Sequence, residues 1–202
     1  MNAPSVFTIG HSNHSVDKFI DLLREHDITA IADVRSLPYS RTNPDFNREF
    51  LQKKLKAVGI VYVYLGRELG ARPNDPSYYE HGRVQYRKLS KSPLFREGLE
   101  RVLRGAQSFH LSLLCAEKEP LVCHRTLLVA RELVVVGASV THIHADGTLE
   151  PHSAAMNRLV RILGMDDKDL YRSREEMIAD ACALQEERIA YVDEDLRKEA
   201  SA

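Results

Sequence analysis

The chain has 202 residues, enough for one domain with a substantial core, and its 44% hydrophobic and 28% charged residues are typical of a globular protein. A formal net charge of −1 and the lack of any apolar run of about eighteen residues argue against a strongly basic nucleic-acid-binding protein and against a transmembrane helix. Three widely spaced cysteines and an N-terminus without a secretory signal lead us to expect a cytoplasmic protein without a disulfide framework.

The near-neutral total charge hides an uneven distribution along the chain. Residues 166–202 carry twelve acidic and six basic side chains, whereas residues 1–165 have a net charge of +5. Most of this positive excess lies in residues 35–104, and it indicates either an anionic ligand or an ordinary solvated surface. We therefore predict an α/β domain at 1–165 and an acidic helical extension at 166–202 that packs on this domain or on a partner chain.

Short apolar runs alternate with amphipathic stretches along the chain. The predicted strands, in order, are 6–9, 28–34, 60–65, 111–114 and 140–144. The predicted helices are 15–25, 43–59, 92–104, 123–137, 152–163 and 172–190, and the longest irregular stretch is 66–90. Strands separated by helices pair in parallel, so we expect an α/β fold: an open, mostly parallel, Rossmann-like sheet of about five strands, with helices on both faces and C-terminal helices.

Polar and reactive side chains gather where the predicted strands end, and in such folds ligands bind beyond these ends. They are His11, Asp33, Arg35, Arg41, Cys115, Glu117, Cys123, His124, Arg125 and His142. Each one alone has a structural explanation, such as a turn cap for Asp33 or core packing for Cys115. Their concentration at consecutive strand ends favours a functional site.

The segment from Cys115 to Arg125 allows three interpretations. Zinc ligation is the weakest, because the spacing Cys-x7-Cys-His lacks the short ligand pairs of structural zinc sites. Anion binding fits better, because Cys123 and His124 lie at a predicted helix N-terminus with free N–H groups. The same position, with His124 and Arg125 adjacent, would favour a thiolate and make Cys123 a nucleophile.

A series of short motifs stands in a fixed order between about residues 5 and 155. The motifs are Thr8–Ser12, Asp33–Arg35 with Pro38, Ser40–Arg41, Phe46–Asn47, Tyr64–Gly66 with Leu69–Gly70, Leu114–Glu117, Cys123–Arg125, His142–Ile143, Asp146–Gly147 and His152. Together they resemble the DUF488 family, a domain of unknown function. The resemblance implies an α/β fold and the importance of these positions, and it implies no established reaction. The pair Gly70-Ala71 departs from the family pattern, which often has a second glycine there.

The interpretation that uses most of these residues is a hydrolase or group transferase acting on a nucleotide or another nucleic-acid-derived anion in a strand-end cleft. The residues expected to carry the chemistry are Asp33, Glu117, His11, His124 and Cys123. Those expected to hold the anion are Arg35, Arg41, Arg125 and Ser12, and those expected to line the pocket are Cys115, Tyr64, Gly66 and His142. Tyrosines and arginines between residues 72 and 87 would offer stacking faces beside positive charge.

Two other interpretations stay open. One is a non-catalytic binding or sensor domain for a phosphorylated ligand or nucleic acid, and the other is an enzyme that uses a cysteine thiol. No cofactor is predicted. A metal-assisted version, with Asp33, Glu117 and His11 around Mg²⁺ or Mn²⁺, is an open alternative that nothing in the sequence supports. The expected partner is an anionic small molecule or a nucleic-acid end rather than a membrane, and the C-terminal helices cover the chain's own sheet or form a homodimer.

Overall fold

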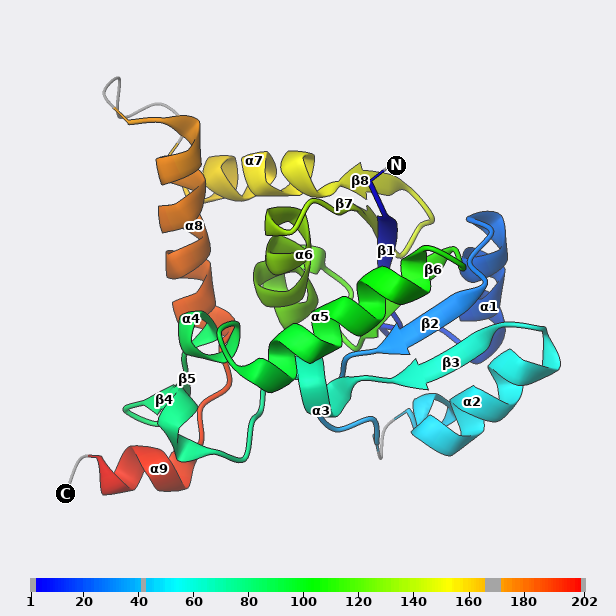
Figure 1. The fold of residues 1–202 in the computed structure, drawn as a ribbon, viewed down its shortest axis with the longest axis horizontal. Helices are drawn as coiled ribbons and strands as arrows, with labels where there is room; N and C mark the ends of the chain where they lie inside the picture. The colour runs from blue at the N-terminus through cyan, green and yellow to red at the C-terminus, as the bar shows by residue number, and fades with distance from the viewer. Residues whose placement is uncertain (1–2, 41–42, 166–171, 201–202) are drawn as a thin grey trace.

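The structure is a computed structural model that describes residues 3–40, 43–165 and 172–200 (Figure 1). Its centre is a six-stranded sheet in the order β3-β2-β6-β1-β7-β8. The strands are β1 (Ser5–Gly10), β2 (Ala30–Asp33), β3 (Val61–Tyr64), β6 (Leu111–Cys115), β7 (Ser139–Ile143) and β8 (Leu149–Pro151). The first five are parallel and β8 runs antiparallel to β7, which confirms the prediction of an open, mostly parallel α/β sheet.

Helices cover both faces of this sheet, as the buried strands β2 and β6 require. On one face Ile31 and Ile143 pack with α1 (Val16–Glu25) and α2 (Arg48–Ala57). On the other face the sheet packs with α5 (Pro93–Ala106), α6 (Arg131–Val135) and α7 (His152–Ile162). Successive β2 residues therefore belong to opposite core clusters, as the period of two along a strand dictates.

The helix starts follow the capping residues of the sequence in two cases and depart from expectation in two others. Ser15 Oγ accepts the Lys18 N–H at 3.2 Å, and Ser92 Oγ accepts the Phe95 N–H at 3.1 Å. The helix expected at 43–59 is divided into η1 (Pro44–Phe46) and α2. The helix expected from residue 123 begins as the π-helical η4 (Arg125–Ala130), which continues into α6, and the separate short helix η3 (Pro120–Val122) precedes it.

The stretch from residue 66 to 90, expected to be irregular, contains several short elements. They are α3 (Gly66–Leu69), η2 (Pro76–Tyr78), β4 (Tyr79–Glu80), β5 (Arg83–Val84) and α4 (Tyr86–Leu89). Chain far along the sequence lies beside this stretch: the Val84 N–H donates to Tyr191 O at 3.0 Å, and the Asp193 N–H donates to Gly82 O at 2.7 Å. The C-terminal part of the chain is therefore hydrogen-bonded to the middle of the chain.

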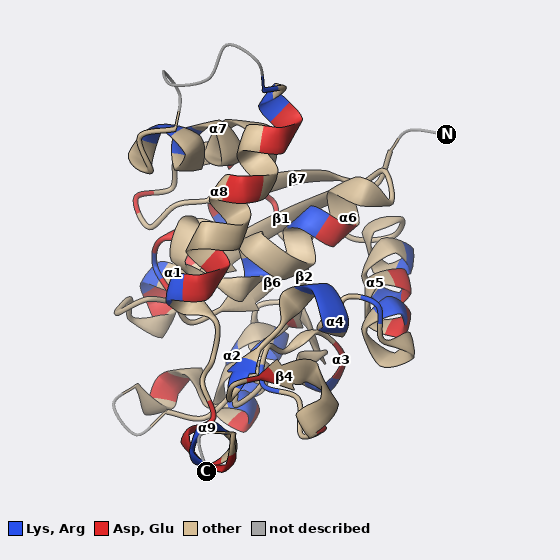
Figure 2. Ribbon diagram, turned by 90° about the vertical axis from the view of Figure 1, so that its left-hand side faces the viewer, with Lys and Arg blue, Asp and Glu red and all other residues tan. Residues whose placement is uncertain are grey.

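That C-terminal part consists of α8 (Arg174–Ile189) and α9 (Glu194–Glu199). Ala181 and Cys182 of α8 are fully buried, and the Gln185 Nε2 donates to Leu121 O at 2.9 Å. One face of α8 thus packs on the chain's own body, while the predicted boundary at residue 166 lies outside the described residues. Figure 2 shows acidic positions along α8 and basic positions on α4 and α2. Within the described ranges, no helix has both the length and the apolar character that crossing a membrane requires.

Candidate functional site

A cavity of about 420 Å³ lies beyond the carboxyl ends of the neighbouring strands β2 and β6. This volume falls in the range of small-molecule sites. Five segments contribute to its walls: the turn after β2, the chain after α3, the turn after β6, the N-terminal end of η4 and the end of α8. The lining residues are Arg35, Ser36, Leu37, Tyr39, Ala71, Arg72, Tyr86, Cys115, Ala116, Glu117, Val122, Cys123, His124, Ile189 and Tyr191.

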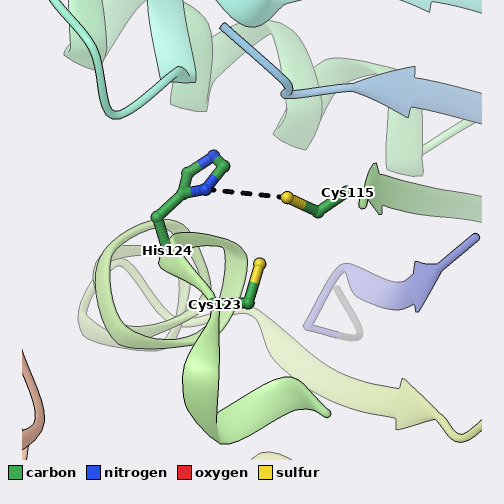
Figure 3. A group of neighbouring side chains, drawn as sticks. All are labelled: Cys115, Cys123 and His124. Atoms are coloured by element: carbon green, nitrogen blue, oxygen red, sulfur yellow. Dashed lines mark hydrogen bonds between the residues drawn. The ribbon is translucent and has the colours of Figure 1, made fainter. Parts of the chain in front are cut away.

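Two thiols and an imidazole from separate elements meet in this cavity, and we call Cys115, Cys123 and His124 the thiol cluster (Figure 3). The Cys115 Sγ lies 3.6 Å from His124 Nδ1. The Glu117 carboxylate lies beside the cluster, because its Oε2 accepts hydrogen bonds from the Cys115 thiol at 3.0 Å and the Cys123 thiol at 3.2 Å. His124 Nε2 donates to Val34 O at 3.0 Å, so Nδ1 is the ring nitrogen that faces the Cys115 sulfur.

The turn between β6 and η3 brings the thiol cluster together, and Arg125 holds this turn in place. Arg125 is fully buried, and its Nη1 donates to Glu117 O at 2.6 Å while Nη2 donates to Lys118 O at 3.4 Å. Gly10 permits the same approach from β1, because a Cβ at this position would lie 1.8 Å from Glu117 O. Arg125, predicted to bind the anion, is thus directed at main-chain carbonyls and does not line the cavity.

Asp33 and Arg35 form a buried ion pair at the end of β2. Asp33 Oδ1 accepts the Arg35 Nε–H at 2.9 Å, and Oδ2 accepts Arg35 Nη2 and the Tyr62 hydroxyl, each at 2.6 Å. Asp33 is completely buried with both oxygens engaged, so it holds Arg35 in position. Arg35 itself lines the cavity, and its Nη1 has no hydrogen-bond partner among the described residues.

His11 and Ser12 lie next to the site without lining the cavity. The His11 ring stacks on Phe46 with centroids 4.3 Å apart, and its Nδ1 donates to Ser12 O at 2.9 Å. Burial, aided by the positive charge of Arg35, lowers the pKa of His11 to about 4. The Ser12 N–H donates to Ala116 O at 2.9 Å, so both residues extend the pairing of β1 with β6 toward the cavity.

The other predicted residues support the site from behind or lie elsewhere. The Tyr64 hydroxyl donates to Ser36 O at 3.0 Å, and Gly66 passes so close that a Cβ there would lie 2.0 Å from Arg35 O. His142 is fully buried in β7 and is not a lining residue of the cavity. Arg41 lies outside the described residues.

Burial and the surrounding hydrogen bonds together set the pKa values of Cys115, His124 and Glu117. Burial, together with the neighbouring Cys123, raises the pKa of the Cys115 thiol well above its usual value. Burial alone would lower the pKa of His124, but the nearby Cys115 and the bond to Val34 O outweigh it and raise that pKa. Burial alone would likewise raise the pKa of Glu117, but the hydrogen bonds from the two thiols lower it, so the carboxyl group is ionised at neutral pH.

Several cavity residues were not among the predicted site residues. Arg72 and Tyr86 were noted only as part of a positive, tyrosine-containing stretch. Tyr191 gave no local signal, because the chain returns to the cavity only after α8. In the structure the Arg72 guanidinium lies over the Tyr191 ring, 4.6 Å from its centroid, which places a cation and an aromatic face together in the wall.

Comparison with known proteins identifies a family but no individual relative. A family model described as a domain of unknown function, DUF488, matches residues 15–131, a range that contains the thiol cluster and the Asp33–Arg35 pair but ends before Tyr191. No curated protein and no solved structure matches the chain.

Proposed function

The chain belongs to DUF488, a family defined by a domain of unknown function, and we propose that it is a hydrolase or group transferase acting on an anionic, nucleotide-like substrate. The observation that carries this proposal is the composition of one cavity. Glu117 and His124 offer a carboxylate and an imidazole for proton transfer, and the guanidinium of Arg35 lies in the same wall.

The walls fit a ligand that combines negative charge with a flat ring. Nη1 of Arg35 has no hydrogen-bond partner within the described part of the chain, and Arg72 adds a second positive charge, which suits a phosphate or carboxylate group. Tyr86 and Tyr191 provide ring faces on which a base would stack. Glu117 is ionised at neutral pH, as a group that accepts a proton from water must be.

The proposal is tested by a turnover screen with a matched pair of variants. The wild-type protein is incubated with nucleoside 5′-monophosphates, short phosphodiesters and uncharged nucleosides, and released base, phosphate and nucleoside are separated by chromatography. We expect turnover in an anionic class only. Glu117→Gln should lower kcat by about 100-fold or more and change the Kd of adenosine 5′-monophosphate little. Glu97→Gln, in an exposed position on α5, should behave as wild type.

Binding of these anions without turnover would contradict the enzyme and favour the sensor or binding domain instead. A second candidate, a thiol enzyme, is favoured by the 3.6 Å distance between Cys115 Sγ and His124 Nδ1. The burial of Cys115 and the carboxylate of Glu117 beside both sulfurs disfavour a free thiolate there. Rapid labelling of Cys115 or Cys123 by iodoacetamide at pH 7 would support the thiol enzyme, and labelling only above about pH 8.5 would count against it.

A further inference from the structure

Cys115, Cys123 and His124 bring two sulfur donors and one imidazole nitrogen close together in the wall of the cavity. We propose that this thiol cluster binds Zn²⁺ through the two sulfurs and His124 Nδ1, with the fourth coordination position free for a water molecule or substrate. The three donor atoms all lie within 4.8 Å of one another, and Figure 3 shows the side chains turned toward one another from β6 and from the start of η4.

The distance between Cys115 Sγ and His124 Nδ1 matches one edge of a tetrahedral zinc site, and the other donor pairs lie within 4.8 Å. With Zn–S bonds of about 2.3 Å and a Zn–N bond of about 2.0 Å, tetrahedral angles place sulfur and nitrogen about 3.5 Å apart. The Cys115 Sγ lies 3.6 Å from His124 Nδ1, so this edge of the tetrahedron needs no rearrangement. Two thiolates and an imidazole favour zinc over the harder Mg²⁺ and Ca²⁺, and the two thiolate charges would balance those of the cation.

The groups around the thiol cluster are those that orient metal ligands. A metal-binding histidine usually donates its other ring N–H to a carbonyl or carboxylate, and His124 Nε2 donates to Val34 O at 3.0 Å. This bond leaves Nδ1 as the nitrogen available to a metal. The Arg125 main-chain N–H lies 3.4 Å from Cys123 Sγ, where it stabilises negative charge on the sulfur.

Glu117 gives the zinc site a connection to the proposed chemistry. Its Oε2 lies 3.0 Å from Cys115 Sγ and 3.2 Å from Cys123 Sγ, and the residue also lines the cavity. Zinc held by three protein ligands lowers the pKa of a water ligand to about 7, and Glu117 would accept the proton that this water loses. With zinc bound, His124 is a metal ligand and Glu117 is the group left for proton transfer. This role of Glu117 rests on the proposed function, whereas the zinc site itself does not.

The test measures metal uptake by the full-length protein without any substrate. Protein stripped of metal by a chelator and fully reduced is dialysed against Zn²⁺, and bound zinc is counted by mass spectrometry. We expect one Zn²⁺ per chain. With Co²⁺ in place of zinc, we expect a sulfur-to-cobalt charge-transfer band and the strong visible bands of a tetrahedral site.

The variants compare cluster cysteines with a cysteine elsewhere in the core. Cys115→Ser and Cys123→Ser should each weaken Zn²⁺ binding by more than about 100-fold, since even outer neighbours of metal ligands contribute up to that factor. Cys182→Ser, a buried cysteine on α8, should bind zinc as wild type does. Circular dichroism checks that each variant is folded. If one of the two serine variants does not fold, His124→Gln is used in its place to test the third ligand.

Absence of zinc uptake by the reduced wild type, or unchanged uptake by folded Cys115→Ser and Cys123→Ser, would overturn the site. A Cys115–Cys123 disulfide that forms in zinc-containing buffer in preference to metal uptake would do the same. The two proposals fail separately: zinc uptake without nucleotide turnover refutes the hydrolase alone. Turnover by a reduced protein that takes up no zinc refutes the zinc site alone.

Discussion

At the scale of single residues, the partners of a charged side chain decide its role. Asp33 is buried with both oxygens hydrogen-bonded, three of these bonds coming from the side chain and main chain of Arg35. A carboxylate in such surroundings fixes the guanidinium rather than exchanging protons with a substrate. The pair therefore places one positive group in the wall of the cavity while its own negative charge stays in the core.

Removing the carboxylate should expose how strongly Arg35 depends on it. Asp33→Asn leaves a buried guanidinium without its counter-charge and should lower the free energy of unfolding by about 3–5 kcal/mol. Tyr62→Phe removes only the hydroxyl bond to Asp33 Oδ2 and should cost about 1–2 kcal/mol. Urea denaturation at pH 7 measures both values. A loss for Asp33→Asn no larger than that for Tyr62→Phe would contradict this account.

His142 should make the protein sensitive to acid. It is fully buried, hydrogen-bonded to Thr8 and His152, and burial lowers its pKa to about 2. The unfolded chain binds a proton near pH 6.5 and the folded one does not, so this contribution to stability is intact above pH 6.5 and decreases as the pH falls below it.

Between pH 7 and pH 5 the free energy of unfolding should therefore fall by about 2 kcal/mol more in wild type than in His142→Gln. Urea denaturation at the two pH values measures the difference. His110→Gln, at an exposed position, is the matched control and should follow wild type. Equal pH dependence in wild type and His142→Gln would show that His142 does not carry the effect.

The arginines show where prediction from sequence reaches its limit at this scale. Arg35 and Arg125 look alike as basic residues that follow strands, and both were predicted to hold an anion. Arg35 lines the cavity, whereas Arg125 donates to the carbonyls of Glu117 and Lys118. The difference depends on which main-chain carbonyls the folded turn brings within reach of each guanidinium. The local sequence does not predict these contacts.

At the scale of elements, close packing at the strand ends shapes the site. Gly10 ends β1 directly against the turn that carries Glu117, with room for a hydrogen but not for a methyl group. The same turn connects β6 to η3 and brings Cys123 back to Cys115. A shift of this turn would move the Glu117 carboxylate and the thiols together.

Gly10→Ala tests this tight contact. Its Cβ would lie 1.8 Å from a main-chain oxygen that cannot rotate away, so the free energy of unfolding should fall by about 2–3 kcal/mol. Gly105→Ala in α5 is the matched control, because its Cβ would meet only the movable end of Leu111, and it should stay within about 1 kcal/mol of wild type. Thermal or urea unfolding of both variants gives the comparison, and similar values would refute the role assigned to Gly10.

The strands that could be predicted are those with short apolar runs, and all five parallel strands stand where such runs indicated. Every residue of β2 and β6 is buried, as a strand covered on both faces requires, whereas Val61 and Val63 of the edge strand β3 are exposed. The two-residue strands β4 and β5 and the three-residue β8 are too short for any alternation to show. Zinc ranked last by spacing, since residues counted along the chain do not reveal that a turn returns Cys123 to Cys115.

At the scale of the whole molecule, the C-terminal segment completes the cavity. Tyr191 reaches the wall through α8, and its main chain is hydrogen-bonded to β5. The family match ends at residue 131, so the thiol cluster lies inside the matched range and Tyr191 lies outside it. The packing of α8 on its own chain explains why Ala181 and Cys182 are buried. A homodimer through the C-terminal helices stays a prediction.

Tyr191→Ala should weaken ligand binding without loss of the fold. It removes a stacking face and the support of the Arg72 guanidinium, so the Kd of adenosine 5′-monophosphate should rise about three- to tenfold. Leu184→Ala, in an exposed position on α8, is the control and should leave the Kd unchanged. Isothermal titration calorimetry measures both, and an unchanged Kd for Tyr191→Ala would show that the segment does not contribute to binding.

The pairing of β5 with residues 191–193 has a consequence for biosynthesis. Ribosomes deliver a chain from its N-terminus, and early parts of a chain begin to fold before later parts emerge. Cys115 and Cys123 are therefore in place while the segment that will cover one side of their cavity is still being translated. During that interval the nascent thiols are open to oxidants and to metal ions, and the wall that Tyr191 contributes is added only once the C-terminal segment has left the ribosome.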